Sequence, residues 1–151
     1  MSTHGLWGFI KNGDYIAKRS YSDSYPSYLG VRFLKACKSG DFSEFEINDD
    51  ENYIRFIKDS LFCEWAYFYD FDKHQFEVWK GFQKEPDKNN PFGQMPEETW
   101  QGSGEFFYPC KLIYRDKVEN IPLSIFEDNN NFLKIIERDK KINDIIGESR
   151  S

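Results

Sequence analysis

Residues 4–13 read HGLWGFIKNG, and this stretch decides how the chain begins to fold. Its apolar part ends at Asn12-Gly13, after which a second β-type segment runs over residues 14–19. Asn-Gly between two such segments is a strong hairpin signal, because a type I′ turn needs a positive φ at both central residues. The stretch holds two further glycines, which weaken a strand unless another backbone approaches closely. We therefore expect an opening β-hairpin whose glycines mark either a functional site or a tight packing corner against the main sheet.

The length and composition of the chain favour one globular domain over residues 1–151. Fifteen Phe, nine Tyr and four Trp residues provide apolar area for a core, since each ring buries much surface when it is packed. The net charge is -6, which argues against direct nucleic-acid binding, because phosphate contacts need clustered Lys and Arg. An acidic surface instead suits a basic protein partner.

Three cysteines, Cys37, Cys63 and Cys110, lie far apart along the chain. An odd number at such spacing predicts neither a disulfide framework nor a zinc site, so we expect no metal and no other cofactor. The first residues lack the basic-then-apolar order of a signal peptide, and no apolar run is long enough to cross a bilayer. We expect a cytoplasmic protein that makes no membrane contact.

The first half of the chain continues with helical and then β-type patterns. Leu29, Phe33 and Cys37 recur at fourth-residue spacing, which predicts an amphipathic helix. Ser27 is a plausible N-cap, and Gly40 ends the pattern. A second helix is expected over residues 53–61. Residues 61–72 and 75–80 then predict two strands joined by a short turn.

The second half holds a long segment without regular pattern, followed by a strand and a helix. Residues 82–105 carry three prolines and three glycines, which predicts a long loop of the kind that often serves function. Residues 106–114 return to β-type composition, and Asn130 or Asn131 is a plausible cap for a last helix that ends at Gly147. This order favours an α+β fold with a mainly antiparallel sheet of roughly five strands and roughly three helices.

Charged and aromatic residues near the turn at residues 23–30 are candidate ligand-binding groups. Asp23 precedes Tyr25-Pro26, where it either orients a ligand or satisfies backbone donors in an Asx-type turn. Arg19 adds a cation that, beside tyrosines, suits an anion or a planar ligand. His4 is placed to contribute to a site near the N-terminus, and a hydrogen-bonded structural imidazole is the alternative.

Glu64 is the most interesting carboxylate, because its neighbours are apolar and its place is in an expected central strand. A carboxyl group in such surroundings is a candidate acid or base in a pocket. The alternative is a structural ion pair with Arg19 or Arg32. The candidate ligand-binding residues are thus His4, Arg19, Asp23, Tyr25 and Glu64.

Five ordered blocks of the chain resemble a widespread uncharacterised family of small bacterial and phage proteins. The blocks are THGL at residues 3–6, NG at 12–13, DSYPSYLG at 23–30, EWAY at 64–67 and EVWKG at 77–81. They extend over far more of the chain than one short motif does. The resemblance implies an origin in bacteria or their mobile elements and a location in the bacterial or phage-infected cell. A role such as inhibiting a host defence protein fits that origin.

A second resemblance concerns GLWG at residues 5–8, which is similar to the opening strand of class II glutamine amidotransferases. These belong to the N-terminal-nucleophile hydrolases, so the similarity implies their layered fold and an amide hydrolysis by the first residue of the mature chain. His4 stands at the aligned position, where that family has Cys. Removal of Met1 would expose Ser2 as a nucleophile beside its own amine, and Thr3 follows it. Ser2 and Thr3 are therefore the candidate catalytic residues.

These observations predict a small acidic protein that acts by binding a protein partner or a small-molecule ligand. The alternative is an amidohydrolase-like enzyme with an N-terminal Ser or Thr nucleophile. The oligomeric state is not indicated by the sequence. If Asp23, Tyr25 and the N-terminus converge on one cavity, a ligand site becomes the leading hypothesis.

Overall fold

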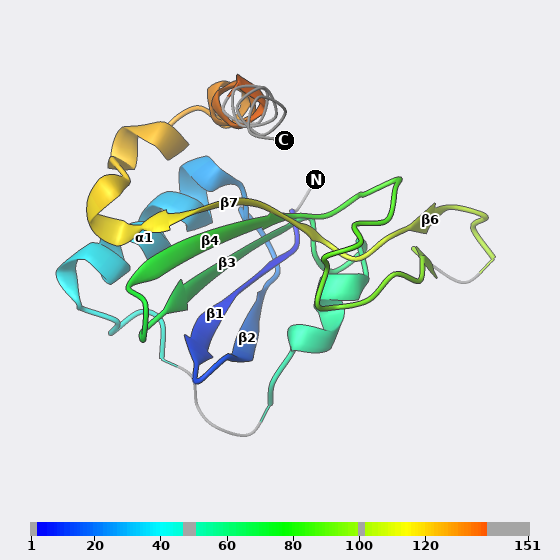
Figure 1. Ribbon diagram of the computed structural model, residues 1–151, viewed down its shortest axis with the longest axis horizontal. Helices are drawn as coiled ribbons and strands as arrows, with labels where there is room; N and C mark the ends of the chain where they lie inside the picture. The colour runs from blue at the N-terminus through cyan, green and yellow to red at the C-terminus, as the bar shows by residue number, and fades with distance from the viewer. Residues whose placement is uncertain (1–2, 47–50, 100–101, 139–151) are drawn as a thin grey trace, which may run out of the picture.

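A five-stranded mixed sheet forms the centre of the computed structural model, which describes residues 3–46, 51–99 and 102–138 (Figure 1). The strand order is β2-β1-β3-β4-β7, with β1 parallel to β3 and the other three neighbouring pairs antiparallel. The strands are β1 (Gly5–Lys11), β2 (Asp14–Ser20), β3 (Trp65–Asp70), β4 (Gln75–Lys80) and β7 (Lys111–Lys117). The expected α+β fold with a mainly antiparallel sheet is confirmed.

The opening hairpin forms as the Asn-Gly signal predicts. Asn12 and Gly13 have φ values of 53° and 82°, as a type I′ turn requires. The two strand glycines allow the close backbone approach that we expected: a Cβ on Gly8 would overlap the carbonyl oxygen of Ile16, and one on Gly5 would overlap that of Trp65. β1 is thus held between β2 and β3 without room for a side chain at these two points.

A helical segment follows the hairpin and covers one face of the sheet. It begins with a π-helical turn at Pro26–Gly30 and continues as α1 (Val31–Ser39), which ends at Gly40 with φ 78°. Ser27 is not the N-cap, because Pro26 already opens the helical turn, and proline is favoured at the first helical position. The Ser27 N–H instead donates to Asn129 Oδ1 at 3.0 Å.

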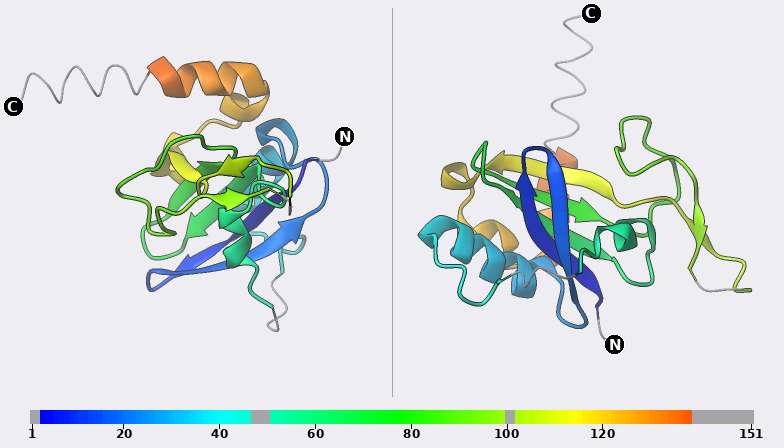
Figure 2. Two further views of the ribbon diagram at one scale, coloured as in Figure 1. Left: turned by 90° about the vertical axis from the view of Figure 1, so that its right-hand side faces the viewer. Right: turned by 90° about the horizontal axis from the view of Figure 1, so that it is seen from below.

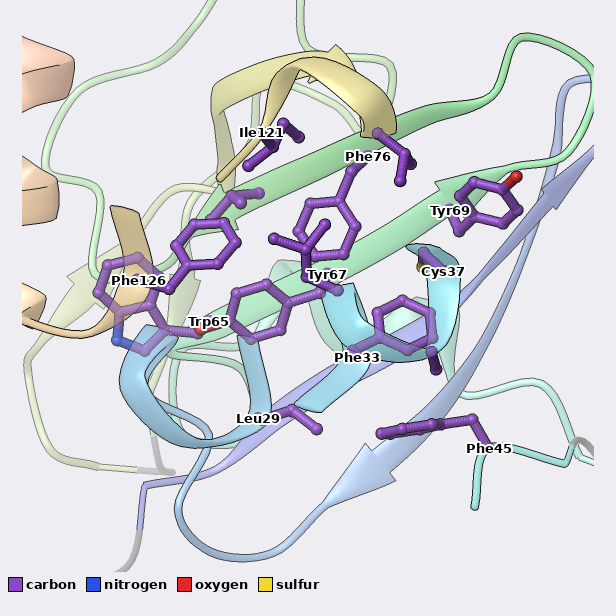
Figure 3. Close-up of a cluster of buried hydrophobic side chains, with 14 of the residues drawn as sticks. Leu29, Phe33, Cys37, Phe45, Trp65, Tyr67, Tyr69, Phe76, Ile121 and Phe126 are labelled. Atoms are coloured by element: carbon purple, nitrogen blue, oxygen red, sulfur yellow. The ribbon is translucent and has the colours of Figure 1, made fainter. Parts of the chain in front are cut away.

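The core on this face consists mainly of aromatic rings from distant segments. Figure 3 shows Leu29 and Phe33 packed with Trp65, Tyr67 and Tyr69 of β3. Two short 3₁₀ helices, η3 (Val118–Asn120) and η4 (Leu123–Phe126), lead to a helix over residues 129–138, drawn in orange in Figure 2. That helix joins the same cluster through the fully buried Phe132.

The cap of the last helix differs from our expectation. Asp128 Oδ1 accepts hydrogen bonds from the backbone N–H groups of Asn130 (2.9 Å) and Asn131 (3.1 Å). Asp128 is therefore the capping residue, and the two asparagines are the first residues that it caps. The predicted end of this helix at Gly147 lies outside the described residues.

The opposite face carries a shorter helix than the one expected over residues 53–61. The structure has a 3₁₀ helix, η2 (Ile54–Lys58), which packs through Ile57 against Leu6, Phe68 and Trp79. The helix stops where Asp59 turns the chain, with its carboxylate accepting from the Leu61 N–H at 3.0 Å. A side chain that bonds the backbone locally competes with helical hydrogen bonds.

The long segment of residues 82–105 contains one short ladder. β5 (Glu97–Glu98) pairs antiparallel with β6 (Phe106–Phe107), and Figure 1 shows this arm extending beyond the end of the main sheet. Cys63 and Cys110, far apart in sequence, lie side by side as free thiols beneath this region. Within the described ranges, no helix is long and apolar enough to cross a membrane.

We predict that Gly8→Ala lowers the free energy of unfolding by about 2 kcal/mol or more. The added methyl group would overlap the backbone of Ile16, which is paired in the sheet and cannot shift to make room. Urea denaturation followed by tryptophan fluorescence measures the change. Ser20→Ala, on the adjacent strand, is the control and should change stability by less than about 0.5 kcal/mol. Equal stability of the two variants would show that β1 and β2 are not packed as described.

Candidate functional site

A cavity of about 900 Å³ lies at the end of the sheet where β1 and β3 begin and β4 ends. We call it the end cavity. One wall comes from residues next to the sheet and the other from the long segment and β6. The lining residues are Thr3, His4, Tyr25, Ser60, Leu61, Glu64, Phe82, Lys84, Thr99, Glu105 and Phe107.

The sheet-side wall presents buried polar groups. The side chains of Thr3 and Ser60 are 3% and 6% exposed. Ser60 Oγ and His4 Nδ1 are both buried and have no hydrogen-bond partner among the described residues. Buried polar groups in proteins are normally hydrogen-bonded, so two residues that line the end cavity each carry an unsatisfied polar atom.

His4 is held by its backbone and by two aromatic edges. Its carbonyl oxygen accepts from the Glu64 N–H at 2.9 Å, which continues the β1–β3 pairing beyond the strand ends. Its ring meets Tyr21 and Phe62 edge-on, each at 6.3 Å between centroids. The imidazole is therefore positioned by packing, while Nδ1 has no hydrogen-bond partner among the described residues.

Glu64 pairs with Lys80, not with Arg19 or Arg32. Lys80 Nζ lies 3.9 Å from Glu64 Oε1, and both side chains are partly buried. The ammonium group also lies 5.1 Å from the ring centre of Trp65 and 4.9 Å from that of Phe82. Burial lowers the pKa of Lys80, and the Glu64 carboxylate acts in the opposite direction.

The wall of the end cavity that comes from the long segment and β6 is aromatic, and its backbone is strained at Phe82. The rings of Phe82 and Phe107 are 5.3 Å apart, and Lys84 Nζ lies 3.8 Å from the centre of the Phe107 ring. Phe82 has φ 57° and a 41% exposed side chain. A bulky residue in the left-handed region is costly, and such strain tends to gather at functional sites.

The structure brings four of the sequence-predicted residues to the end cavity: Thr3, His4, Tyr25 and Glu64. Ser2, the other candidate nucleophile, lies outside the described residues. Tyr25 and the N-terminal residues thus converge on one cavity, while Asp23, the third member of the expected arrangement, does not line it.

Arg19 and Asp23 lie outside the lining of the end cavity. The Arg19 guanidinium stands 4.5 Å from the ring centre of Tyr21 and 4.6 Å from that of Phe62, so it contacts the rings that hold His4. Asp23 is exposed and has φ 54°, and its carbonyl oxygen accepts from the Leu29 N–H at 3.2 Å. Its main chain thereby shapes the turn that presents Tyr25.

Among the other lining residues, Ser60, Lys84, Thr99 and Phe107 were missed by sequence reasoning. Ser60 follows the shorter 3₁₀ helix that replaced an expected longer helix. The other three lie in or next to the long segment, whose prolines and glycines did signal a functional loop. Which of its side chains face the sheet depends on the β5–β6 pairing, for which residues 82–105 hold no local signal.

The most buried carboxylate of the sheet is Glu77, which the sequence analysis did not single out. Its Oε1 accepts from the Tyr15 hydroxyl at 2.8 Å and the Trp79 indole N–H at 2.9 Å, and Arg115 Nη2 lies 2.8 Å from Oε2. All of these groups satisfy one another, and burial beside Glu77 raises the pKa of Tyr15. This network is a structural support, in contrast to the unpartnered atoms of the end cavity.

Comparisons with known proteins found no match: a scan against protein-family models, a search of curated proteins and a search of solved structures all came back empty. Of the residues that the structure describes, no three His, Cys, Asp or Glu side chains form a group that could hold a metal ion. Function is therefore argued from the geometry of the site.

Titration of Lys80 should appear in the pH dependence of stability. Because the pKa of Lys80 is lower in the folded than in the unfolded protein, the unfolded chain binds more protons between the two values, and stability rises with pH. We predict that the wild type gains stability relative to Lys80→Arg as pH rises from about 8 toward the ordinary lysine value of 10.5.

Arginine keeps the positive charge but does not titrate in this range, so the difference between the two proteins isolates Lys80. Urea unfolding at a series of pH values measures it, with Lys80→Met as a second non-titrating reference. A stability difference that stays constant across the series would contradict the partial burial of this ammonium group.

Proposed function

We propose that the protein acts by binding a small organic ligand in the end cavity. The observation that carries the proposal is the meeting of two unpartnered buried polar atoms, Ser60 Oγ and His4 Nδ1, with an aromatic wall around about 900 Å³ of space. Ligand sites in proteins are typically concave, of this size, and apolar with a few convergent polar groups.

The lining indicates what kind of molecule fits. Phe82, Phe107 and Tyr25 supply apolar surface suited to a planar body. Ser60, Thr3 and His4 supply hydrogen-bonding groups at the sheet-side wall. An amphipathic ligand with a planar apolar part and a polar head uses both walls.

A protein partner that covers the mouth is the competing occupant. Three exposed apolar side chains lie on or next to the lining: Leu61 (45% exposed), Phe82 and Phe106 (51% exposed). Exposed rings of this kind are typical anchors at interfaces. The resemblance to small bacterial and phage proteins makes a host defence protein the natural candidate for such a partner.

Variants of the two adjacent phenylalanines in β6 distinguish a small ligand from a protein partner. Phe107 lines the end cavity, whereas Phe106 does not and is exposed. We predict that anilinonaphthalene sulfonate, an amphipathic fluorescent probe, binds at one saturable site and that Phe107→Ala weakens it about tenfold, which corresponds to about 1.4 kcal/mol. Phe106→Ala is the matched control and should leave the affinity within about twofold.

A fluorescence titration with each variant measures these affinities, and Ser60→Ala reports on the polar wall. Equal losses in the two phenylalanine variants would place the probe on the outer surface and favour the protein partner. Absence of saturable binding to the wild type would remove the ligand proposal.

A second candidate, an amide hydrolase, is favoured by the position of Thr3. This residue is almost fully buried on the end cavity, next to His4 and on the same wall as Glu64. A terminal Ser or Thr uses its own amine as the base, so the chemistry needs Ser2 or Thr3 to be the first residue of the mature chain. The similarity of the opening strand to N-terminal-nucleophile hydrolases supports this reading.

The hydrolase candidate predicts that release of ammonia from glutamine depends on the terminal hydroxyl. Intact mass of the purified protein identifies its first residue, and Ser2→Ala or Thr3→Ala, whichever removes that hydroxyl, should reduce the activity to background. Thr3→Ser is the conservative control and should retain activity if Thr3 is the nucleophile. Activity that survives both alanine substitutions, or a retained Met1, would exclude this mechanism.

A further inference from the structure

Two buried thiols, those of Cys63 and Cys110, lie in contact with each other. Cys63 comes just before β3 and Cys110 just before β7, and their sulfur atoms are 3.3 Å apart. The Cys110 S–H donates to Cys63 Sγ and also lies 3.4 Å from the Cys63 carbonyl oxygen. The two residues are 0% and 1% exposed.

The surrounding backbone holds both cysteines in place. The Cys110 N–H donates to the Ile57 carbonyl oxygen at 2.9 Å, and the Cys110 carbonyl oxygen accepts from Asn90 Nδ2 at 2.8 Å. Gly81 lies so close to the Cys63 carbonyl oxygen that a Cβ there would overlap it. The contact between the sulfurs is therefore set by packed main chain on both sides.

A disulfide needs only a small movement from this arrangement. The S–S bond length is about 2.05 Å, so the sulfurs must approach by roughly 1 Å from their separation of 3.3 Å. Cys37, the third cysteine, is also buried but belongs to the cluster on the other face of the sheet.

We propose that Cys63 and Cys110 are a modification site, which a hydroperoxide converts to an intramolecular disulfide. The occupant of the end cavity plays no part in this proposal. Burial at this depth keeps bulky thiol reagents such as glutathione away from the sulfurs, whereas hydrogen peroxide, which is close to water in size, reaches them through small local openings of the packing.

The reaction balances in two steps. Cys63, whose sulfur accepts the hydrogen bond, loses its proton and attacks one peroxide oxygen; the O–O bond breaks, water leaves, and Cys63 becomes a sulfenic acid. Cys110 then attacks the Cys63 sulfur, the S–O bond breaks, and a second water leaves. Two thiols and one peroxide thus yield one disulfide and two waters.

The two steps have different speeds. Burial raises the pKa of the Cys63 thiol, with Cys110 adding to the effect and the Lys80 ammonium opposing it, so little thiolate is present and the first step is slow. The second step needs no diffusion because the sulfurs are already in contact. Sulfenic acid on Cys63 should therefore not accumulate while Cys110 is present.

The disulfide would join the residue before Glu64, which lines the end cavity, to the start of β7. The loop that it closes contains β4 and the whole long segment of residues 82–105. Closing a long loop restricts the unfolded chain, so the oxidised protein should resist thermal unfolding more strongly than the reduced one.

The experiment treats folded full-length protein with hydrogen peroxide and follows it by intact mass and non-reducing peptide mapping. We expect loss of two hydrogen atoms from the monomer, a linked peptide that contains Cys63 and Cys110, full reversal by dithiothreitol once the protein is unfolded in urea, and a midpoint of thermal unfolding raised by at least about 5 °C. Cys37→Ala is the matched control and should behave as the wild type does.

A second variant, Cys110→Ala, tests for the sulfenic acid intermediate on Cys63. In Cys110→Ala the sulfenic acid on Cys63 has no partner and should appear as a gain of one oxygen atom in the intact mass, whereas the wild type should show no such gain. A wild-type protein that resists peroxide, links only between molecules, or forms the disulfide only in urea would overturn the proposal. Oxidation of Cys37 at the same rate as the pair would overturn it too.

Discussion

Backbone hydrogen bonds between β1 and β3 join the opening hairpin to the middle of the chain, and they run in parallel register from Gly5 opposite Trp65 to Ile10 opposite Asp70. A parallel pair cannot be closed by a tight turn and needs a crossover connection. The connection here carries α1, which covers one face of the sheet with apolar side chains. Gly5 permits this pairing because a side chain there would meet the Trp65 carbonyl oxygen of β3, and Gly8 permits the β1–β2 pairing because a side chain there would meet the Ile16 carbonyl oxygen.

The same pairing creates the end cavity. Parallel strands begin at the same edge of a sheet, so residues 3 and 4, just before β1, lie beside residues 60–64, just before β3. β4 runs antiparallel to β3 and therefore ends at that edge, where it delivers Phe82 and the long segment. An end of the sheet where three segments meet leaves polar groups without strand partners, and these are the groups that a ligand can use.

Two kinds of buried polar group occur among the described residues: those that form a structural hydrogen-bond network and those that lack a partner at the end cavity. Glu77 is nearly inaccessible and is satisfied by Tyr15, Trp79 and Arg115. Ser60 and His4 line the end cavity, and each carries a buried polar atom with no hydrogen-bond partner among the described residues. A satisfied buried network rigidifies a fold, whereas an unsatisfied group carries a free-energy cost that binding can relieve.

The amino-acid sequence predicts the features that depend on local conformation: the Asn12-Gly13 turn, the stop of α1 at Gly40, the hairpin between β3 and β4, and the aromatic core. These follow from allowed backbone angles and from hydrophobic periodicity, which a short window of residues contains. Three relations emerge only from the folded structure: Ser60 and Phe107 line one cavity, Glu64 pairs with Lys80, and Cys63 contacts Cys110. Each of those relations depends on the register between segments distant in the chain, and no local pattern specifies which strands pair or which of their ends meet.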